Sequence, residues 1–299
     1  MGVIVYDKTD ERVKLSDISE APPSRMSRED AQGELAGLGD ELFELQDLLW
    51  GARTHSVLVV LQGRDTAGKD GAIKHVVGFL NPRGVHVTSF GVPTAEEREH
   101  DFLWRIHRNT PRLGEFGIFN RSHYEDVLVV RVHNLMPKEI WGERYGHIRD
   151  FEELLVEHRT IVLKFFLHIS KDEQKKRLLE REQDPRTAWK LTANDWQERE
   201  LWNDYTDAYE EAISRTATKR APWRIVPADS KWYRNLVIAR SIVEELRHRQ
   251  PEGPDDRLDG GERRVAQAAF ELADVGDVEV GAFSEFGLRQ RGRGPQCSE

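Results

Sequence analysis

The glycine-rich stretch LQGRDTAGKDG, residues 61–71, constrains the fold of this chain more than any other segment. Gly63 and Lys69 bound the G-x-x-x-x-G-K spacing of a phosphate-binding loop. The apolar run SVLVVL precedes the loop and AIKHVV follows it, an order that predicts a buried strand, a turn and a helix. In such a loop, backbone N–H groups and a helix N-terminus converge on a phosphate, which the lysine ammonium also reaches. The phosphate-binding residues expected from this pattern are Gly63, Thr66, Ala67, Gly68, Lys69, Asp70 and Gly71.

Two acids distinguish this loop from an ordinary one. Asp70 stands where Ser or Thr usually supplies a hydroxyl to Mg²⁺, and Asp65 lies inside the loop. Carboxylates beside a phosphate repel it, since like charges at ~4 Å cost several kcal/mol in a partly dry site. We therefore expect Asp65 to hold Mg²⁺, or Mn²⁺ in its place, if the loop binds phosphate. The alternative is a strand-to-helix turn in which Asp65 and Thr66 only cap the helix.

Composition narrows the class of protein. The 299 residues are enough for one substantial α/β domain with extensions. With 53 acidic and 44 basic residues the net charge is −9, so nucleic acid is not an expected partner, and an anionic substrate needs a local basic groove. The single cysteine, Cys297, excludes an intrachain disulfide framework. Without a membrane-spanning apolar run or a secretory signal, a cytoplasmic enzyme is expected.

The chain divides by composition into three stretches. Residues 1–50 are expected to form a polar arm on the surface and then, over 27–50, an amphipathic helix with leucines at three- or four-residue spacing. Residues 51–250 alternate apolar runs with helical patterns, which predicts an α/β core with a parallel sheet of about five strands flanked by helices. Residues 251–299 are rich in Gly, Pro and charge, and are expected to be a largely flexible tail.

The elements of the core follow from the same patterns. The expected strands are 56–61, 85–90, 116–119, 160–169 and 223–226. The expected helices are 69–80, 94–109, 123–134, 149–157, 171–182, 194–215 and 230–249. In the helix 194–215, the row Trp202, Tyr205, Tyr209 and Ile213 is expected to pack in the core rather than to stack on bases.

A second polar motif, GIFNRSHYED, lies about 50 residues beyond the loop. A strand that ends there would lie beside the loop strand, at the carboxyl edge where open α/β sheets bind ligands. Asn120 stands at this strand end and brings no charge, which strengthens the case for Asp65 as the principal metal acid. Arg121 could clamp phosphate oxygens with its planar fork. The alternative for Arg121 is a surface ion pair with Glu125 or Asp126.

A third basic segment follows the strand 160–169. On a helix, Arg177 and Arg181 are four residues apart and share a face. This geometry suits a lid, over about 171–200, whose guanidinium groups close on a transferring phosphoryl group. The alternative is a solvated helix with pairs such as Glu173–Arg177.

With these motifs in order, the chain resembles the polyphosphate kinase 2 family from about Leu35 to Arg247. The resemblance is carried by GRDTAGKDG, FLNPRGV, HDFLWRIHRNTP, GIFNRSHYEDVLVVRV, KKRLLER and APWRIVPADSKWYRN. It implies a phosphate-loop kinase core with a helical lid. It also implies Mg²⁺-dependent transfer between inorganic polyphosphate and a nucleotide, by a dimer or a tetramer.

The resemblance also implies roles for individual residues. Asp65 corresponds to the metal-associated acid, Lys69 to the group that holds the transferring phosphate, and Arg121 to a second phosphate clamp. Many relatives have Asp at the position of Asn120, and this departure weakens a metal role there. Glu125 resembles the subgroup that phosphorylates nucleoside monophosphates. Arg177 and Arg181 correspond to lid arginines, and the candidates for a basic channel are Lys74, Arg83, Arg121, Lys175, Arg177, Arg181, Lys219, Lys231 and Arg234.

The expected reaction is in-line transfer of the terminal phosphoryl of polyphosphate to AMP or ADP. Catalysis is assigned to Asp65, Lys69, Arg121, Arg177 and Arg181, and Lys74 and Arg83 are added to the phosphate-binding residues. Two alternatives remain open at this point. One is an ATP-dependent nucleotide or small-metabolite kinase, and the other is a sensor that binds without turnover.

Overall fold

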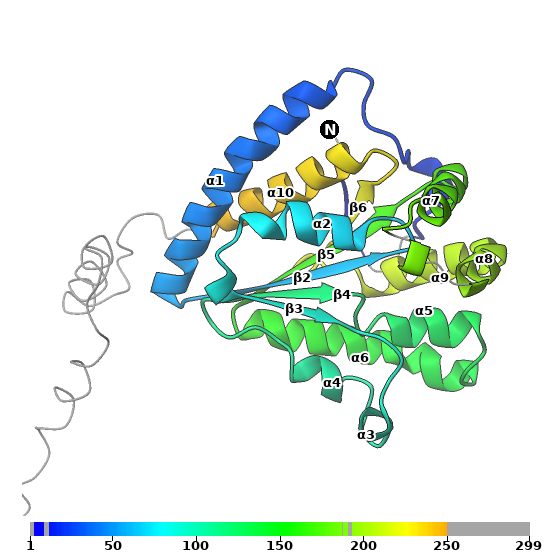
Figure 1. Cartoon of the computed structure of the whole chain (residues 1–299). Coiled ribbons are helices and arrows are strands. Elements are labelled where there is room, and N and C mark those ends of the chain that lie inside the picture. Colours follow the sequence, from blue (N-terminus) through cyan, green and yellow to red (C-terminus); the bar gives the residue numbers. More distant parts are fainter. Residues whose placement is uncertain (1–2, 9–11, 187, 191–192, 250–299) are drawn as a thin grey trace, which may run out of the picture. The chain divides into compact units, whose positions relative to one another are not determined.

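A six-stranded sheet with the order β1–β6–β5–β2–β4–β3 forms the centre of the molecule (Figure 1). The computed structural model describes residues 3–8, 12–186, 188–190 and 193–249. The strands are β1 (Ile4–Tyr6), β2 (Ser56–Gly63), β3 (Val85–Ser89), β4 (Phe116–Asn120), β5 (Thr160–His168) and β6 (Trp223–Pro227). The strands β2 to β6 pair in parallel, and β1 pairs antiparallel with β6 at one edge.

Helices connect these strands. They are α1 (Arg28–Ala52), α2 (Lys69–His75), α3 (Ala95–Arg98), α4 (Trp104–His107), α5 (Glu125–Val132), α6 (Lys138–Glu157), α7 (Lys171–Gln183), α8 (Ala193–Glu200), α9 (Trp202–Thr216) and α10 (Lys231–Arg247). Short 3₁₀ turns lie at Leu15–Asp17, Val77–Phe79, Pro82–Gly84 and Ala188–Lys190. None of the helices in the described part of the chain is both long and apolar enough to cross a bilayer.

Two layers of helices cover the sheet. The helices α1, α2 and α10 lie on one face, and α5, α6 and α9 lie on the other (Figure 1). The central strand β2 is buried along its whole length, and its side chains alternate between the two faces. Val59 packs with the α1–α10 layer, whereas Leu58 and Val60 pack with the α5–α9 layer. A strand buried on both faces explains the unbroken apolar run that precedes the loop.

The expected parallel α/β sheet is confirmed, and all five expected strands are present. The sixth strand, β1, was not expected, because it is only three residues long and lies in a polar segment. Three expected helices are divided: 69–80 into α2 and the 3₁₀ turn Val77–Phe79, 94–109 into α3 and α4, and 194–215 into α8 and α9, which meet at Leu201. The expected helix 149–157 is the second half of α6, which begins at Lys138. The predicted tail, 251–299, lies outside the described residues.

The N-terminal arm does not simply lie on the surface, as the sequence analysis expected. Val13 and Leu15 are buried with the α5–α9 layer. Their backbone N–H groups donate to Ser214 Oγ and Glu210 Oε1 of α9, at 2.9 and 2.8 Å. The periodicity of so short a segment could not reveal these contacts, because they depend on side chains about 200 residues away.

Candidate active site

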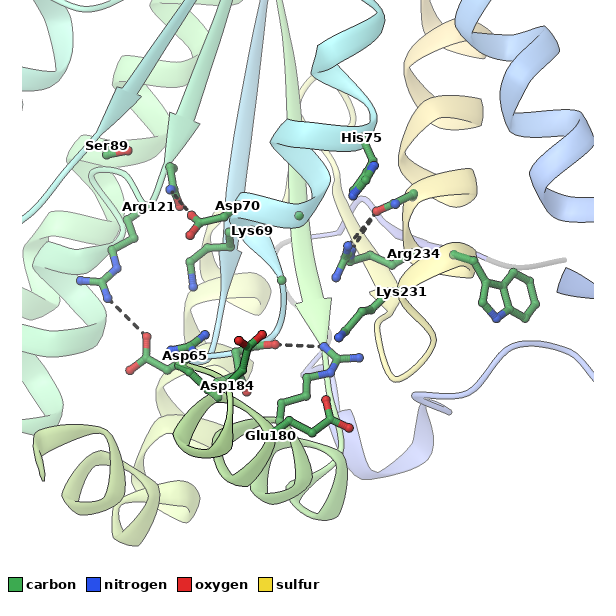
Figure 2. A pocket seen from close by; sticks show the side chains of 18 of the residues that line it. Asp65, Lys69, Asp70, His75, Ser89, Arg121, Glu180, Asp184, Lys231 and Arg234 are labelled. Atoms are coloured by element: carbon green, nitrogen blue, oxygen red, sulfur yellow. Dashed lines mark hydrogen bonds and ion pairs between the residues drawn. The ribbon is translucent and has the colours of Figure 1, made fainter. Parts of the chain in front are cut away.

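The glycine loop between β2 and α2 opens into a cavity of about 1020 Å³ at the carboxyl edge of the sheet (Figure 2). Loop residues line the cavity together with residues from β4, α7 and α10. The lining residues that the sequence analysis named are Asp65, Thr66, Gly68, Lys69, Asp70, Gly71, Asn120, Arg121, Arg177, Arg181, Lys231 and Arg234. This is the edge at which open parallel sheets bind ligands.

The loop has a tight backbone conformation. Thr66 has φ +64° and Gly68, the residue before α2, has φ +105°. A positive φ is unfavourable for a β-branched residue such as Thr66, so the surroundings must hold it in place. Lys69 bends back over the loop, and its Nζ donates to the carbonyls of Gly63 (2.7 Å) and Arg64 (3.3 Å). Burial lowers the pKa of Lys69, and the charge of Asp65 opposes this shift.

The two loop carboxylates pair with residues at the end of β4. The register Leu61↔Asn120 places this strand end beside the loop. Asp65 Oδ1 lies 3.3 Å from an Nη of Arg121, and Asp70 Oδ1 accepts from Asn120 Nδ2 at 2.9 Å. The expected convergence of the loop and the GIFNRSHYED motif is therefore present. Figure 2 shows Arg121 reaching toward Asp65 across the cavity.

The donor set fits a hard divalent cation. Asp65 and Asp70 offer carboxylate oxygens in one cavity, and Mg²⁺ commonly binds through one or two carboxylates together with substrate phosphates. The described residues contain no cluster of three or more His, Cys, Asp or Glu that would form a closed protein cage. Asn120 turns its amide nitrogen toward Asp70, so it orients that acid through a hydrogen bond.

Glu125, in the first turn of α5, interacts electrostatically with these groups. Burial raises the pKa of Glu125, and the charges of Arg121 and Lys69 oppose that increase. Burial alone would lower the pKa of Arg121, but Glu125 and Asp65 raise it above its usual value. The charges on Asp65, Lys69, Arg121 and Glu125 are therefore coupled, so a change at one alters the others.

The lid arginines differ in their surroundings. Arg181 lines the cavity. Arg177 also lines it, yet its side chain is only 5% exposed and its guanidinium donates to protein groups on three segments. Nε donates to Glu173, Nη1 to the Thr66 carbonyl at 2.9 Å, and Nη2 to the Ala228 carbonyl at 2.7 Å. The alternative pair Glu173–Arg177 is thus present, at 2.8 Å, but it is mostly buried rather than solvated.

Arg234 of α10 packs directly against the loop, whereas the sequence predicted only that it belongs to a basic channel. Its Nη1 donates to the Ala67 carbonyl at 3.3 Å, and the side chain is 2% exposed. A Cβ on Gly68 would lie 1.8 Å from Nη1, and one on Gly71 would lie 2.7 Å from Nη2. The backbone of Gly71, the second glycine of GKDG, does not have a positive φ and so does not itself require glycine. A glycine at such a position indicates that another group packs closely against it, and here that group is Arg234.

Two further contacts join the loop to the segment after β5, and the sequence gave no sign of them. Gln174 Nε2 of α7 donates to the Asp65 carbonyl at 3.2 Å. The guanidinium of Arg64 lies 3.8 Å from the ring centre of Trp202, at the start of α9, and donates to the Trp202 carbonyl at 3.1 Å. Burial lowers the pKa of Arg64 to about 10.

Four of the predicted basic residues do not reach the cavity. Arg83 lies in the turn before β3 and Lys219 lies before β6, so both are at the amino edge of the parallel sheet, opposite the loop. Neither residue lines the cavity, so the structure does not bring Arg83 to the phosphate loop. Lys74 on α2 and Lys175 on α7 are exposed and do not line the cavity. A helix distributes successive residues around its axis, so nearness in sequence to a site does not place a side chain in it.

Comparisons with known proteins identify the family of this chain. A family model described as polyphosphate kinase 2 matches residues 25–254. The AMP/ADP-polyphosphate phosphotransferase of Meiothermus ruber is 51% identical over 229 residues, which cover 75% of this chain and 86% of that protein. The ADP-polyphosphate phosphotransferase of Rhodopseudomonas palustris is 45% identical over 219 residues, covering 69% of this chain and 76% of that protein.

The structural comparison gives the same family. The crystal structure of polyphosphate kinase 2 from Arthrobacter aurescens TC1 has a TM-score of 0.78 to this chain at 38% sequence identity. The match covers 90% of this chain and 99% of that one. The family model, the relatives and the solved structure thus agree, and this chain belongs to the polyphosphate kinase 2 family.

Proposed function

We propose that this enzyme transfers the terminal phosphoryl group of inorganic polyphosphate to AMP, to ADP or to both. The observation that carries the proposal is the cavity, which gathers Lys69, Asp65, Asp70 and Arg121 around one glycine loop. Membership of the polyphosphate kinase 2 family supports polyphosphate as the donor. The names of the two relatives support AMP and ADP as acceptors.

The reaction is an in-line displacement. An ionised oxygen of the acceptor phosphate attacks the terminal phosphorus of polyphosphate, and the bond from that phosphorus to its bridging oxygen breaks. The shortened polyphosphate leaves as an anion. No covalent protein intermediate is needed, so the protein contributes positioning and charge compensation.

The protein groups have separate tasks in this displacement. Lys69 lies within the loop and holds the phosphate that the loop binds, because an anion at this position compensates the burial of its ammonium. Arg121 approaches from the end of β4 and Arg181 from α7, so they reach the reacting groups from different elements. Arg121 is 43% exposed at its side chain and can move toward a ligand.

Asp65 and Asp70 are the groups that would hold Mg²⁺, or Mn²⁺ in its place. When bound, the cation compensates the negative charge of the phosphates and lets them lie beside two carboxylates. Asn120 holds Asp70 by a hydrogen bond of 2.9 Å, which fixes the direction of that carboxylate. In the ligand-free arrangement, Arg121 pairs with Asp65 at 3.3 Å.

A donor–acceptor matrix tests the proposal. Polyphosphate or ATP is supplied as donor to AMP, ADP, GMP or GDP, with and without Mg²⁺, and the products are separated by ion-exchange chromatography. We expect turnover with polyphosphate in the presence of Mg²⁺, and none when the metal is chelated. Turnover with ATP and none with polyphosphate would make the protein an ATP-dependent kinase. Stoichiometric binding of polyphosphate without turnover would make it a sensor.

A further inference from the structure

The carbonyl groups of the loop are held by side chains from two distant helices. Gln174 of α7 donates to the Asp65 carbonyl at 3.2 Å. Arg177 of α7 donates to the Ala67 carbonyl at 3.3 Å, and Arg234 of α10 donates to the same oxygen at 3.3 Å. In a trans peptide the C=O and the following N–H point in opposite directions. Holding the Ala67 carbonyl therefore turns the N–H of Gly68 away from the two arginines.

Every N–H group of Arg177 already has a protein acceptor. A guanidinium has five such donors. One binds Glu173 Oε1 (2.8 Å), two bind the carbonyls of Thr66 (2.9 Å) and Ala67 (3.3 Å), and two bind the carbonyls of Ala228 and Asp229 (both 2.7 Å). A phosphoryl group could gain a hydrogen bond from Arg177 only if one of these bonds broke. The side chain instead ties the loop to the turn between β6 and α10.

Arg234 completes this arrangement from the other helix. Its Nε and Nη2 donate to Asn235 Oδ1 at 3.1 and 2.8 Å, and no carboxylate of the described residues forms an ion pair with it. Its guanidinium occupies the space above Gly68 and Gly71. Burial and, to a smaller extent, the neighbouring charge of Arg177 lower the pKa of Arg234 to about 10. Two buried cations thus lie against one carbonyl of the loop.

We propose that Arg177 and Arg234 are positioning residues that hold the phosphate loop in its anion-binding shape through the Ala67 carbonyl. Arg177 acts on the loop and does not contact the transferring phosphoryl group. This changes the role that the sequence analysis gave Arg177, whereas Arg181 keeps its place in the cavity. The inference rests on the proposed function, because it takes the loop to be the phosphate site.

Hydrogen exchange in the ligand-free enzyme separates the two roles of Arg177. In Arg177→Lys, a three-donor ammonium replaces the five-donor fork, so amide exchange should rise in peptides covering 63–69. Peptides from α6, on the other face of the sheet, should exchange as in the wild type. A residue that only contacted the phosphoryl group would leave the ligand-free loop unchanged, and that result would overturn the inference. A rise in all peptides alike would also overturn it, since it would indicate general destabilisation.

Binding of inorganic triphosphate, measured by titration calorimetry with Mg²⁺, gives the second readout. Arg177→Lys should weaken binding by about 10-fold or more, since hydrogen bonds from charged donors have effects of that order. Lys176→Ala is the matched control, because Lys176 is 65% exposed on the same helix. Wild-type affinity in Arg177→Lys combined with a fall in kcat would overturn the inference, since it would place Arg177 at the transition state.

Chemical rescue and a reference variant complete the test. In Arg177→Ala, guanidinium ions should restore part of the affinity for triphosphate and lower the exchange at 63–69, whereas methylammonium ions should not. Equal rescue by both cations would overturn the inference, because it would mean that only charge matters. Lys69→Ala distinguishes a failure of the proposed function from a failure of the inference alone. If this variant binds triphosphate normally, the loop is not the phosphate site, and the proposed function falls together with the inference.

Discussion

The two sides of the phosphate loop are built in different ways. On the cavity side, Asp65 and Arg121 form a partly exposed pair at 3.3 Å, with side chains 33% and 43% exposed. On the carbonyl side, Arg177 and Arg234 are 5% and 2% exposed and donate to backbone oxygens. The same residue type thus has two uses. Exposed arginines remain able to bind a ligand, whereas buried arginines fix the backbone that binds it.

This difference predicts different consequences for mutations on the two sides. Changes on the cavity side should remove interactions that the ligand makes directly, and should leave the fold intact. Changes on the carbonyl side should disturb the loop even before a ligand arrives, because the backbone there depends on the buried donors.

The largest effect is expected for Lys69→Ala on the cavity side. The buried ammonium lies inside the loop that is proposed to bind the phosphate, and removal of such a preorganised charge commonly costs ~10²–10³-fold in rate. Steady-state kinetics with polyphosphate and ADP measure the loss, and circular dichroism checks the fold. Asp65→Asn, which keeps the shape of the side chain, should have a comparable effect. Turnover within a few-fold of the wild type in either variant would contradict the roles assigned here.

Arg121→Ala should have the next largest effect. Arg121 is held at the end of β4 with φ +64° and reaches across the cavity to Asp65. Loss of one charged clamp is expected to lower kcat/KM by about 10²-fold. Arg131→Ala is a control, because that arginine pairs with Glu211 of α9 at 2.7 Å and does not line the cavity. Equal losses in the two variants would mean that Arg121 acts only through stability.

The sequence was sufficient to predict which residues meet on the cavity side of the loop. Strand, glycine spacing and helix lie next to each other in the chain, and the carboxyl edge of a parallel sheet brings Arg121 to the same place. On the carbonyl side, Gly71 indicates that a side chain packs there, but which side chain it is could not be predicted. Arg234 meets Ala67 across 167 positions of sequence, and only the packing of α10 against α2 creates that contact.

The distance of Arg83 from the cavity has a related physical cause. Arg83 belongs to FLNPRGV, one of the motifs that carry the family resemblance. A residue that precedes a parallel strand lies at the amino edge, one strand length from the loop. The buried polar contacts of the N-terminal arm with Glu210 and Ser214 were missed for a different reason, since they depend on long-range packing alone.

Gly71→Ala tests the carbonyl side with a single methyl group. The added Cβ would lie 2.7 Å from Nη2 of Arg234, so the guanidinium must move off the loop. We expect roughly a tenfold loss of kcat/KM, in line with the usual cost of overpacking. Gly78→Ala is the control, since a Cβ there meets nothing within 4 Å.

The double variant Gly71→Ala, Arg234→Lys sharpens this test. Lysine has no planar fork at the position of the clash, so the penalty of the alanine should be smaller in this background than in the wild type. Additive penalties would mean that Gly71 and Arg234 act independently, and would argue against the packing described for the carbonyl side.

Glu125→Asn should have a smaller effect, and one that depends on the acceptor. The family resemblance associates a glutamate at this position with nucleoside monophosphates, so removal of the Glu125 carboxylate should lower the use of AMP relative to ADP by about fivefold. Burial raises the pKa of Glu125, so its charge is lost at a higher pH than that of an exposed glutamate. The AMP/ADP ratio of the wild type should therefore fall as the pH decreases through that raised pKa, and the ratio of the variant should stay flat. Equal losses on both acceptors would make Glu125 a structural residue.

The smallest effect is expected for Arg83→Ala, at the amino edge. Each phosphate contact contributes about 0.7–0.9 to the slope of log affinity against log salt, by analogy with nucleic acid backbones. Lys231→Ala, which removes a cation that lines the cavity, should lower the slope for long polyphosphate by about one contact. Arg83→Ala should leave both slope and affinity within the usual twofold range of surface substitutions. An equal fall in slope for the two variants would mean that polyphosphate extends around the molecule to the opposite edge of the sheet. In that case polyphosphate would contact both the carboxyl edge and the amino edge of the sheet. The view that only the carboxyl edge binds this substrate would then be wrong, even if the loop binds phosphate as proposed.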